Sequence, residues 1–454
     1  MQRITRRMLL LLVLMGLMLV GTLVFAWRYA VSSDEWVVFS GSPHVYSGGN
    51  LSLGIVTDRT GTVLLDSTNG RRYADDSELR KATMHLLGDR YGYISAPVLN
   101  DYADELIGFS KITGLHTLSD TTVQAKLSIS ASAQKTALAA LAGRKGTIGV
   151  YNYETGEILC AVTSPTYDPD AMPDIEGDTT GTYGGVYLNR FFQTTYVPGS
   201  IFKIVTTAAA LEELPDAQTK TFFCEGSCRI GADTINCNGT HYTQTLSQAL
   251  ANSCNVAFAQ LAVELGADVM TKYANKLGIT DSLQFDGITT APGSFDLKDA
   301  AESQIAWSGI GQHTDLINAA QFMTLMGELA GGGDAAEPYI MKQVSNGYEA
   351  KRQTVSVPLQ QKTCEILTEY LRNNVITMYG QWHFPDLYVC AKSGTAELGP
   401  DEIPHATFSG FIQDANYPLA FIVIVENGGS GSATCAPIAG QVLKACCTAM
   451  DAER

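Results

Sequence analysis

The pattern of apolar and polar positions separates one long apolar run from a series of shorter segments. The run over residues 8–27 contains no charged residue and consists mostly of Leu, Val and Met. A helix needs about 20 apolar residues to cross the hydrocarbon core of a membrane, so this run predicts a transmembrane helix. Residues 31–50 follow and are rich in Ser, Gly, Asn and Pro. This composition predicts a linker.

Beyond the linker, the pattern predicts a small α+β module over about residues 50–125. Two apolar stretches within 53–65 flank a turn-forming Asp-Arg-Thr-Gly sequence at 58–61. They predict a strand hairpin. The spacing of apolar residues over 77–87 predicts a short helix.

The rest of the chain, residues 126–454, is expected to form the main domain. Strand patterns occur at 123–129, 146–153, 157–162, 407–412 and 419–425, and helix patterns at 131–141, 200–213, 246–266 and 442–450. Strands at both ends with helices between them predict a mixed α/β domain. In such a domain the two ends of the segment share one sheet.

Charge excludes one class of partner. The chain has 46 acidic and 30 basic residues and a formal net charge of -16. Nucleic-acid binders carry clustered Lys and Arg, which this sequence lacks outside its first residues. No nucleic-acid partner is expected.

The charges around the apolar run predict its orientation. Arg3, Arg6 and Arg7 precede the run, whereas Asp34 and Glu35 follow it closely. By the positive-inside rule, residues 1–7 are a cytoplasmic tail, 8–27 span the cell membrane once, and the remainder is extracytoplasmic. The alternative is a cleaved signal peptide. Its shorter apolar core and A-x-A-like cleavage site are not apparent here, so the anchor is favoured.

The ten cysteines fall into two groups. Seven lie in apolar or small-residue surroundings and are expected to be buried thiols: Cys160, Cys254, Cys364, Cys390, Cys435, Cys446 and Cys447. Cys224, Cys228 and Cys237 share a loop-like stretch with His241, where a disulfide or a zinc site is chemically possible. The spacing does not match a C-x2-C framework. A disulfide between Cys224 and Cys237 is therefore preferred.

Two short motifs predict a serine nucleophile. Residues i and i+3 share one face of a helix, so Lys203 can place its amine beside the hydroxyl of Ser200. The lysine acts as a base only if burial or a nearby cation, for which Lys392 is the candidate, lowers its pKa. Ser253 and Asn255 are predicted to relay a proton and to orient the lysine and the substrate.

A third motif follows the strand-like residues 387–389 and predicts substrate binding. Lys392, Ser393 and Thr395 would place an ammonium group and two hydroxyl groups along a sheet edge, which suits a substrate carboxylate. Gly394 would let the substrate backbone approach closely. Each motif alone is a weak signal. Their order along one chain is typical of serine-lysine acyltransferases.

With these motifs, the chain resembles the class B penicillin-binding proteins, which are monofunctional peptidoglycan D,D-transpeptidases. The resemblance is carried by the segments 58–64, 155–159, 164–169, 196–200, 253–258 and 392–397. It implies an α/β fold, a penicillin-binding/β-lactamase-like transpeptidase domain whose antiparallel sheet is flanked by helices. No cofactor and no metal are implied.

The resemblance also implies a reaction and partners. Ser200 would be acylated by the penultimate D-Ala of a stem peptide, terminal D-Ala would leave, and the acyl group would pass to an amine. The backbone N–H groups of Ser200 and Thr395 would form the oxyanion hole. β-Lactams would bind the same site. Without room for a glycosyltransferase domain before residue 120, a membrane-embedded glycan polymerase is the implied partner.

The sequence departs from the family pattern at three places. His313 stands where the family has the second glycine of a Gly-Gln-Gly element, and it is interpreted as a structural histidine rather than a general base. Ser393 replaces the commoner Thr and keeps the hydroxyl. The module over 50–125 is short for the family's N-terminal pedestal.

Three alternative functions stay open at this point. A D,D-carboxypeptidase would use the same site with water as the acceptor. A β-lactamase or β-lactam sensor is less favoured, because the one Glu-x-x-x-Asn motif, Glu369 to Asn373, lies in a predicted helix just before Lys392. A catalytically inactive scaffold of wall synthesis would not need the intact motifs.

Overall fold

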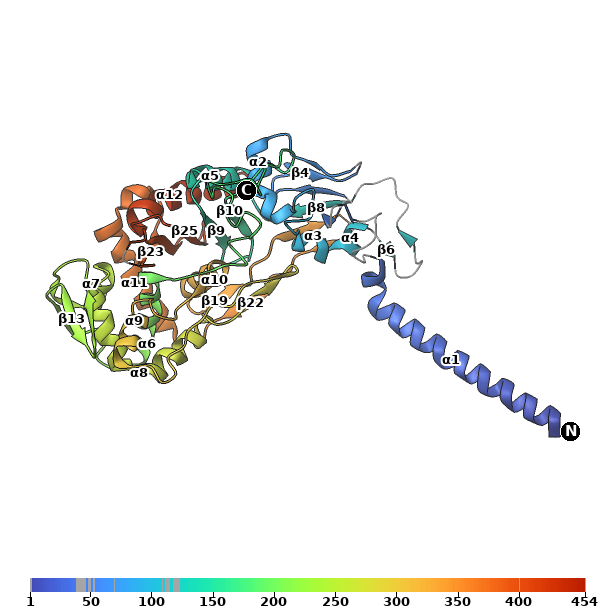
Figure 1. Cartoon of the computed structure of the whole chain (residues 1–454), viewed down its shortest axis with the longest axis horizontal. Helices are drawn as coiled ribbons and strands as arrows, with labels where there is room; N and C mark the ends of the chain where they lie inside the picture. The colour runs from blue at the N-terminus through green and yellow to red at the C-terminus, as the bar shows by residue number, and fades with distance from the viewer. Residues whose placement is uncertain are drawn as a thin grey trace.

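The computed structural model places the N-terminal helix and the elements that carry the three sequence motifs at opposite ends of the molecule (Figure 1). It describes residues 2–37, 46–47, 50–51, 54–68, 70–107, 109–110, 115–116, 123–345, 347–399 and 401–453. Helix α1 (Gln2–Val37) is long and apolar enough to cross a membrane, which suggests a single-pass anchor. It continues into the predicted linker. Residues 38–45, 48–49 and 52–53 of the predicted linker and hairpin lie outside the described residues.

A five-stranded antiparallel sheet forms the centre of the main domain. In spatial order it contains β10 (Ile158–Ser164), β9 (Gly146–Asn152), β25 (Leu419–Val425), β24 (His405–Ile412) and β23 (Val389–Ala396). Strands from the beginning and the end of the domain therefore share one sheet, as predicted. β23 is an edge strand, so one side of its backbone is open to a further strand.

Helices cover both faces of this sheet. α5 (Ala131–Leu141) and α12 (Gly431–Asp451) pack on one face, and α10 (Ala319–Ala330) packs on the other. Side chains of a strand alternate between the faces, so Phe421 belongs to the core under α5 and α12, and Ile422 belongs to the core under α10. Every residue of β25 is buried, which explains its continuous apolar sequence.

A helical region extends from the sheet toward the end of the molecule opposite α1 (Figure 1). Its helices are η1 (Gly199–Phe202), α6 (Lys203–Glu213), α7 (Leu246–Ala251), α8 (Asn255–Lys276), α9 (Glu302–Ser308), α11 (Gln361–Asn374), η2 (Val375–Tyr379) and η3 (Gln381–His383). A small β subdomain, residues 221–245, is inserted between α6 and α7. It contains β12 (Thr221–Cys224), β13 (Ser227–Ile230), β14 (Asp233–Asn236) and β15 (Tyr242–Thr245).

The N-terminal module shares a six-stranded sheet with the later part of the chain. This sheet has the order β21 (Tyr348–Glu349), β20 (Met341–Val344), β8 (Gln124–Leu127), β3 (Ile55–Thr57), β4 (Val63–Asp66) and β5 (Arg72–Tyr73). The expected domain boundary at residues 125 and 126 falls inside β8. A buried ion pair at 3.2 Å between Arg59 and Glu157 further joins the module to the main domain.

The remaining short elements connect these parts. They are β1 (Tyr46–Ser47), β2 (Asn50–Leu51), α2 (Ser77–Leu87), α3 (Pro97–Asp101), α4 (Ala103–Ile107), β6 (Phe109–Ser110), β7 (Leu115–His116), β11 (Thr195–Tyr196), β16 (Gln284–Phe285), β17 (Ile288–Thr289), β18 (Ile317–Asn318), β19 (Asp334–Ala336) and β22 (Thr354–Ser356). The predicted helices over 77–87 and 131–141 are confirmed. The closing helix, predicted over 442–450, is wrong in extent because it already begins at Gly431.

Candidate active site

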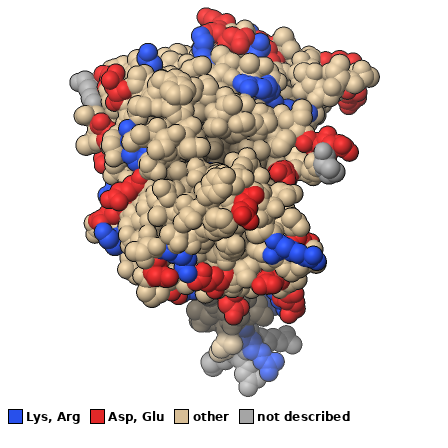
Figure 2. Space-filling view, turned by 90° about the vertical axis from the view of Figure 1, so that its left-hand side faces the viewer, with Lys and Arg blue, Asp and Glu red and all other residues tan. Residues whose placement is uncertain are grey.

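The three motifs meet in one cavity of about 360 Å³ at the junction of η1, the break between α7 and α8, and the edge strand β23. The cavity is lined by Ser200, Asn236, Asn238, Ser253, Asn255, Trp307, Ile310, Gln312, Ser393, Thr395, Glu397, Ser430 and Ser432. Figure 2 views the end of the molecule that carries these elements: charged side chains lie mainly around its margin.

Local backbone geometry presents Ser200 at the start of a helix. Gly199 has φ +57°, which favours glycine, and its N–H donates to the carbonyl oxygen of Gly311 at 3.0 Å. A Cβ on Gly199 would lie 2.6 Å from the carbonyl oxygen of Thr395, so η1 packs directly against β23. Ser200 lies in the short 3-10 helix η1, and α6 begins only at Lys203. The predicted single helix over 200–213 is wrong for this first turn.

The amine of Lys203 is fully buried and contacts the second motif. Its Nζ lies 2.8 Å from Oδ1 of Asn255, 2.7 Å from the carbonyl oxygen of Ser253 and 3.3 Å from Oγ of Ser253. Burial lowers the pKa of Lys203 well below its usual value, and repulsion from Lys392 lowers it further. A neutral amine in this position can accept a proton from a neighbouring hydroxyl.

The second lysine approaches Ser253 from the other side. Nζ of Lys392 lies 3.0 Å from Oγ of Ser253 and 2.8 Å from the carbonyl oxygen of Ser393. Burial lowers the pKa of Lys392 to about 7. A hydroxyl both accepts and donates hydrogen bonds, so Ser253 can accept from Lys392 while donating to a neutral Lys203. This geometry forms a proton path between the two amines.

The second motif occupies a break between two helices rather than one continuous helix. Ser253 has φ +54°, and Cys254 caps the N-terminus of α8. The segment 246–266, for which a helix is predicted, is divided between two helices: α7 ends at Ala251 and α8 begins at Asn255. Because of the break, the side chains of Ser253 and Asn255 both reach Lys203.

The third motif lies within β23 itself. Ser393 and Thr395 line the cavity. A Cβ on Gly394 would lie 2.1 Å from Oγ1 of Thr407 and 2.8 Å from the carbonyl oxygen of Pro198. Gly394 therefore allows η1 to pack closely against the strand, a structural reason that differs from the predicted approach of a substrate backbone.

Tyr379 is a site residue that the motifs did not predict. It ends η2, its hydroxyl accepts the N–H of Ser393 at 3.1 Å, and it lies 3.4 Å from Nζ of Lys392. His313, by contrast, is exposed and does not line the cavity. It has φ +73°, the conformation that the family's glycine would favour. Glu369 lies on α11 and also does not line the cavity.

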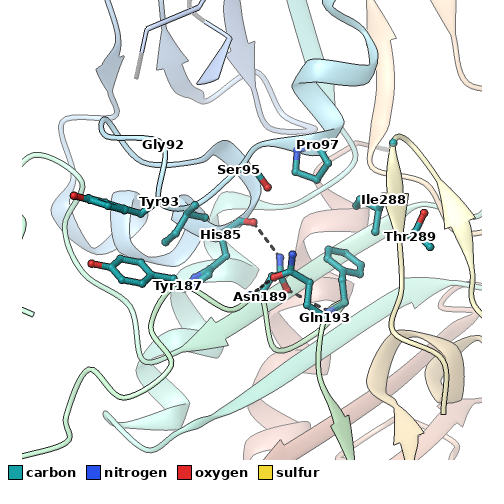
Figure 3. A pocket seen from close by; sticks show the side chains of 13 residues that line it. His85, Gly92, Tyr93, Ser95, Pro97, Tyr187, Asn189, Gln193, Ile288 and Thr289 are labelled. Atoms are coloured by element: carbon teal, nitrogen blue, oxygen red, sulfur yellow. Dashed lines mark hydrogen bonds between the residues drawn. The ribbon is translucent and has the colours of Figure 1, made fainter. Parts of the chain in front are cut away.

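A second cavity of about 340 Å³ lies between the N-terminal module and the main domain (Figure 3). His85 lines it, and a ring nitrogen of this histidine lies 2.8 Å from the carbonyl oxygen of Val186. Burial lowers the pKa of His85 to about 4, so the imidazole is neutral at physiological pH. The lining residues described here include no serine-lysine pair, so the first cavity is the candidate active site.

The cysteines differ from the prediction in one respect. All ten are free thiols, so the preferred disulfide between Cys224 and Cys237 is wrong. The seven cysteines expected to be buried are buried. One of them, Cys254, joins Cys224, Cys237 and His241 in a cluster that could hold a metal ion.

The fold and the site define a serine acyltransferase. The family model of the penicillin binding protein transpeptidase domain matches residues 146–444. The chain belongs to this family, and the predicted resemblance, transpeptidase class and fold are confirmed.

Known relatives agree with this assignment. The peptidoglycan D,D-transpeptidase PbpA of Mycobacterium tuberculosis is 29% identical over 339 residues, which cover 66% of this chain and 67% of the relative. Penicillin-binding protein A of the same organism, solved as a ceftriaxone acyl-enzyme complex, matches with a TM-score of 0.74 and 24% identity over 87% of this chain and 98% of that chain. A D,D-transpeptidase domain from Eggerthella lenta matches with a TM-score of 0.75 and 24% identity over 88% and 98%.

Proposed function

We propose that this protein is a peptidoglycan D,D-transpeptidase that cross-links stem peptides through an acyl-Ser200 intermediate. One observation carries the proposal: Oγ of Ser253 lies within hydrogen-bond distance of both Lys203 and Lys392, at 3.3 and 3.0 Å, in the cavity that Ser200 lines. Acyl transfer requires that a proton leave the nucleophile and reach the leaving amine. This arrangement supports both transfers.

In the first half-reaction, Oγ of Ser200 attacks the carbonyl carbon of the penultimate D-Ala, and its proton passes to the neutral amine of Lys203. The C–N bond to the terminal D-Ala breaks while Ser253 donates a proton to the leaving nitrogen. Lys203 then returns its proton to Ser253. The products are an ester on Ser200 and free D-Ala, and both lysines regain their starting states.

In the second half-reaction, an amine of a neighbouring stem peptide attacks the ester carbonyl. The amine loses a proton to Lys203, and Ser200 regains one as the ester bond breaks. The backbone N–H groups of Ser200 and Thr395 are proposed to stabilise the oxyanion in both steps. The new amide bond is the cross-link.

Substrate binding is assigned to the edge strand β23. An extended peptide can add to the open side of an edge strand through backbone hydrogen bonds. Ser393 and Thr395, which line the cavity, would then face the terminal carboxylate of the stem peptide, and Gly394 would keep the strand against η1. Hydroxyl donors suit a carboxylate.

We further propose the predicted membrane arrangement. Residues 1–7 would be cytoplasmic, 8–27 would span the cell membrane, 28–125 would form the linker and small module, and 126–454 the extracytoplasmic transpeptidase domain. The asymmetry of Arg3, Arg6 and Arg7 around the apolar run supports this orientation. A membrane-embedded glycan polymerase is the proposed partner, which the family resemblance implies.

The test uses the full chain in detergent with a fluorescent penicillin. Wild-type protein is expected to form a lasting covalent adduct, Ser200→Ala to form none, and the exposed control Ser227→Ala to react as the wild type does. Failure of folded wild-type protein to react would support the inactive scaffold instead. Loss of the adduct within minutes would indicate a β-lactamase.

A second measurement identifies the acceptor. The protein is incubated with a D-Ala-D-Ala stem peptide and an added amine, and the products are weighed by mass spectrometry. A transfer product is expected. Hydrolysis alone, with no amine incorporated, would indicate a D,D-carboxypeptidase.

A further inference from the structure

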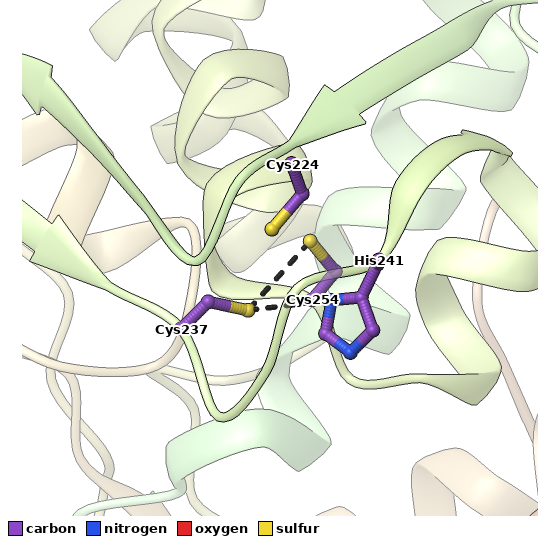
Figure 4. A group of neighbouring side chains, drawn as sticks. All are labelled: Cys224, Cys237, His241 and Cys254. Atoms are coloured by element: carbon purple, nitrogen blue, oxygen red, sulfur yellow. Dashed lines mark hydrogen bonds between the residues drawn. The ribbon is translucent and has the colours of Figure 1, made fainter.

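A cluster of four metal-ligating side chains lies beside the active site without taking part in acyl transfer (Figure 4). One ligand atom from each of Cys224, Cys237, His241 and Cys254 lies within 4.8 Å of the others. The residues come from four places in the fold: the end of β12, the residue after β14, the residue before β15 and the cap of α8.

Two distances within the cluster match those expected around a tetrahedral zinc ion. Zinc binds sulfur at about 2.3 Å and nitrogen at about 2.0 Å, so two sulfurs lie about 3.8 Å apart and sulfur and nitrogen about 3.6 Å apart. The sulfurs of Cys237 and Cys254 are 3.8 Å apart, and the sulfur of Cys237 is 3.6 Å from Nδ1 of His241. A disulfide would require about 2.05 Å. A disulfide joins only two cysteines, so one of the three cluster cysteines would remain without a disulfide partner.

We propose that Cys224, Cys237, His241 and Cys254 bind one zinc ion. Three sulfurs and one imidazole nitrogen fill all four positions of a tetrahedral site, the arrangement of a structural rather than a catalytic zinc. On binding, three thiols release their protons and the histidine stays neutral. The ion remains Zn²⁺, so no oxidant or reductant is needed.

The surrounding backbone already supports metal-bound sulfurs. The N–H of Asn255 donates to the sulfur of Cys237 at 3.3 Å, and the N–H of Ala257 donates to the sulfur of Cys254 at 3.4 Å. Hydrogen bonds of this kind orient ligands and stabilise negative charge on sulfur. The N–H of His241 also donates to the carbonyl oxygen of Cys224 at 3.1 Å, which holds two of the four ligands together.

The site would strengthen the attachment of the β subdomain to the main core. Residues 221–245 form two separate two-stranded sheets, and a two-stranded sheet alone is marginally stable in water. Only a few of its apolar side chains are buried, among them Phe222, Ile230 and Ile235. A zinc ion would link both two-stranded sheets to the N-terminus of α8, which belongs to the main core.

The same ion would hold the second catalytic motif in place. Cys254 stands between Ser253 and Asn255, whose side chains both contact Lys203. The amide of Asn255 also donates to the carbonyl oxygen of Asn236 at 2.9 Å, directly before the ligand Cys237. Displacement of the cluster would therefore move the groups that contact the base.

Metal content tests the site directly. The full chain is purified in detergent with a thiol reductant and zinc, and metal is measured by inductively coupled plasma mass spectrometry. We expect one zinc per wild-type chain and one per chain in Cys228→Ser, whose cysteine lies in the same subdomain but outside the cluster. Cys237→Ser is expected to lose the metal. Wild-type protein without zinc would overturn the proposal.

A cobalt spectrum keeps the test independent of how the variants fold. Wild-type protein is stripped with a chelator and loaded with Co²⁺, which is expected to give thiolate charge-transfer bands and the intense visible bands of tetrahedral cobalt. A weak octahedral spectrum would contradict the site. A disulfide between any two cluster cysteines in anaerobically purified protein would contradict it as well.

Penicillin labelling then tests the link to catalysis. Chelation is expected to slow labelling by about ten- to a hundredfold, because small displacements of positioning groups have effects of that size. Added zinc should restore the rate. Equal labelling before and after chelation would show that the ion does not hold the motif. Ser200→Ala should keep its zinc, so failure of the metal site and failure of the proposed acyl transfer are separate outcomes.

Discussion

Because the amine of Lys392 is buried, we expect its titration to make the free energy of unfolding rise with pH. We expect Lys392→Met to remove this contribution. The unfolded chain keeps this proton up to the ordinary pKa of 10.5, whereas the folded protein releases it above about 7. Between these values the unfolded state binds more protons, so raising the pH favours the folded state. The contribution is present above pH 10.5 and is lost as the pH falls to about 7.

The size of the effect follows from the pKa values. One proton changes the free energy of unfolding by about 1.4 kcal/mol per pH unit. The whole window, from a pKa of about 7 to 10.5, therefore corresponds to about 5 kcal/mol. Lys392→Met removes this titration, so the slope of stability against pH should fall by about 1.4 kcal/mol per unit.

The assay is urea unfolding of the full chain in detergent from about pH 7.5 to about pH 9.5. Buried thiols whose pKa values are raised, such as Cys390, act in the opposite direction, but they do so in both proteins. The difference in slope between wild type and Lys392→Met therefore reports the titration of this amine together with its repulsion of Lys203. The exposed Lys298 provides the control Lys298→Met, which should leave the slope unchanged. Equal slopes in all three proteins would show that Lys392 keeps its proton in the folded state.

Two further predictions concern the packing of the site. Tyr379→Phe leaves the backbone N–H of Ser393 in β23 without its acceptor. An unsatisfied buried group costs about 1–3 kcal/mol, so this variant should slow penicillin labelling roughly five- to a hundredfold. Tyr388→Phe, at a half-exposed side chain, is the control, and equal rates for the two variants would refute the role of Tyr379. Gly394→Ala places a methyl group 2.8 Å from the carbonyl oxygen of Pro198 and should lower the free energy of unfolding by about 1–3 kcal/mol. Thermal unfolding checks this against Gly399→Ala, where the nearest atom is 4.0 Å away.

Elements determined by local sequence could be predicted well. The alanine-rich helix over 131–141 and the helix over 77–87 have the right spacing, and each begins after a side chain, Ser130 or Asp76, that accepts hydrogen bonds from the first turn. The three motifs also locate the cavity, because each carries its chemistry in adjacent residues. Local signals of this kind need no knowledge of the rest of the fold.

Features that depend on distant residues could not be predicted in this way. Strand β20 pairs with β8 although more than two hundred residues separate them. The sequence of neither strand indicates which strand it pairs with. Tyr379 enters the site from η2 with no motif around it. Cys254 looked like an ordinary buried thiol, because only the folded chain brings it to Cys237.

The burial of Lys203 and Lys392 explains why the active site needs a rigid fold around it. Burial without a countercharge is unfavourable for an amine, and Lys203 and Lys392 are both fully buried and share one hydroxyl, that of Ser253. The unfavourable burial favours neutral amines, and a neutral amine is the form that can accept a proton. The site persists because the rest of the fold supplies the missing free energy: the doubly covered sheet fixes β23, and the cluster at Cys254 is placed to fix the helix break. Loosening either support should let water reach the amines, raise their pKa values and remove the base.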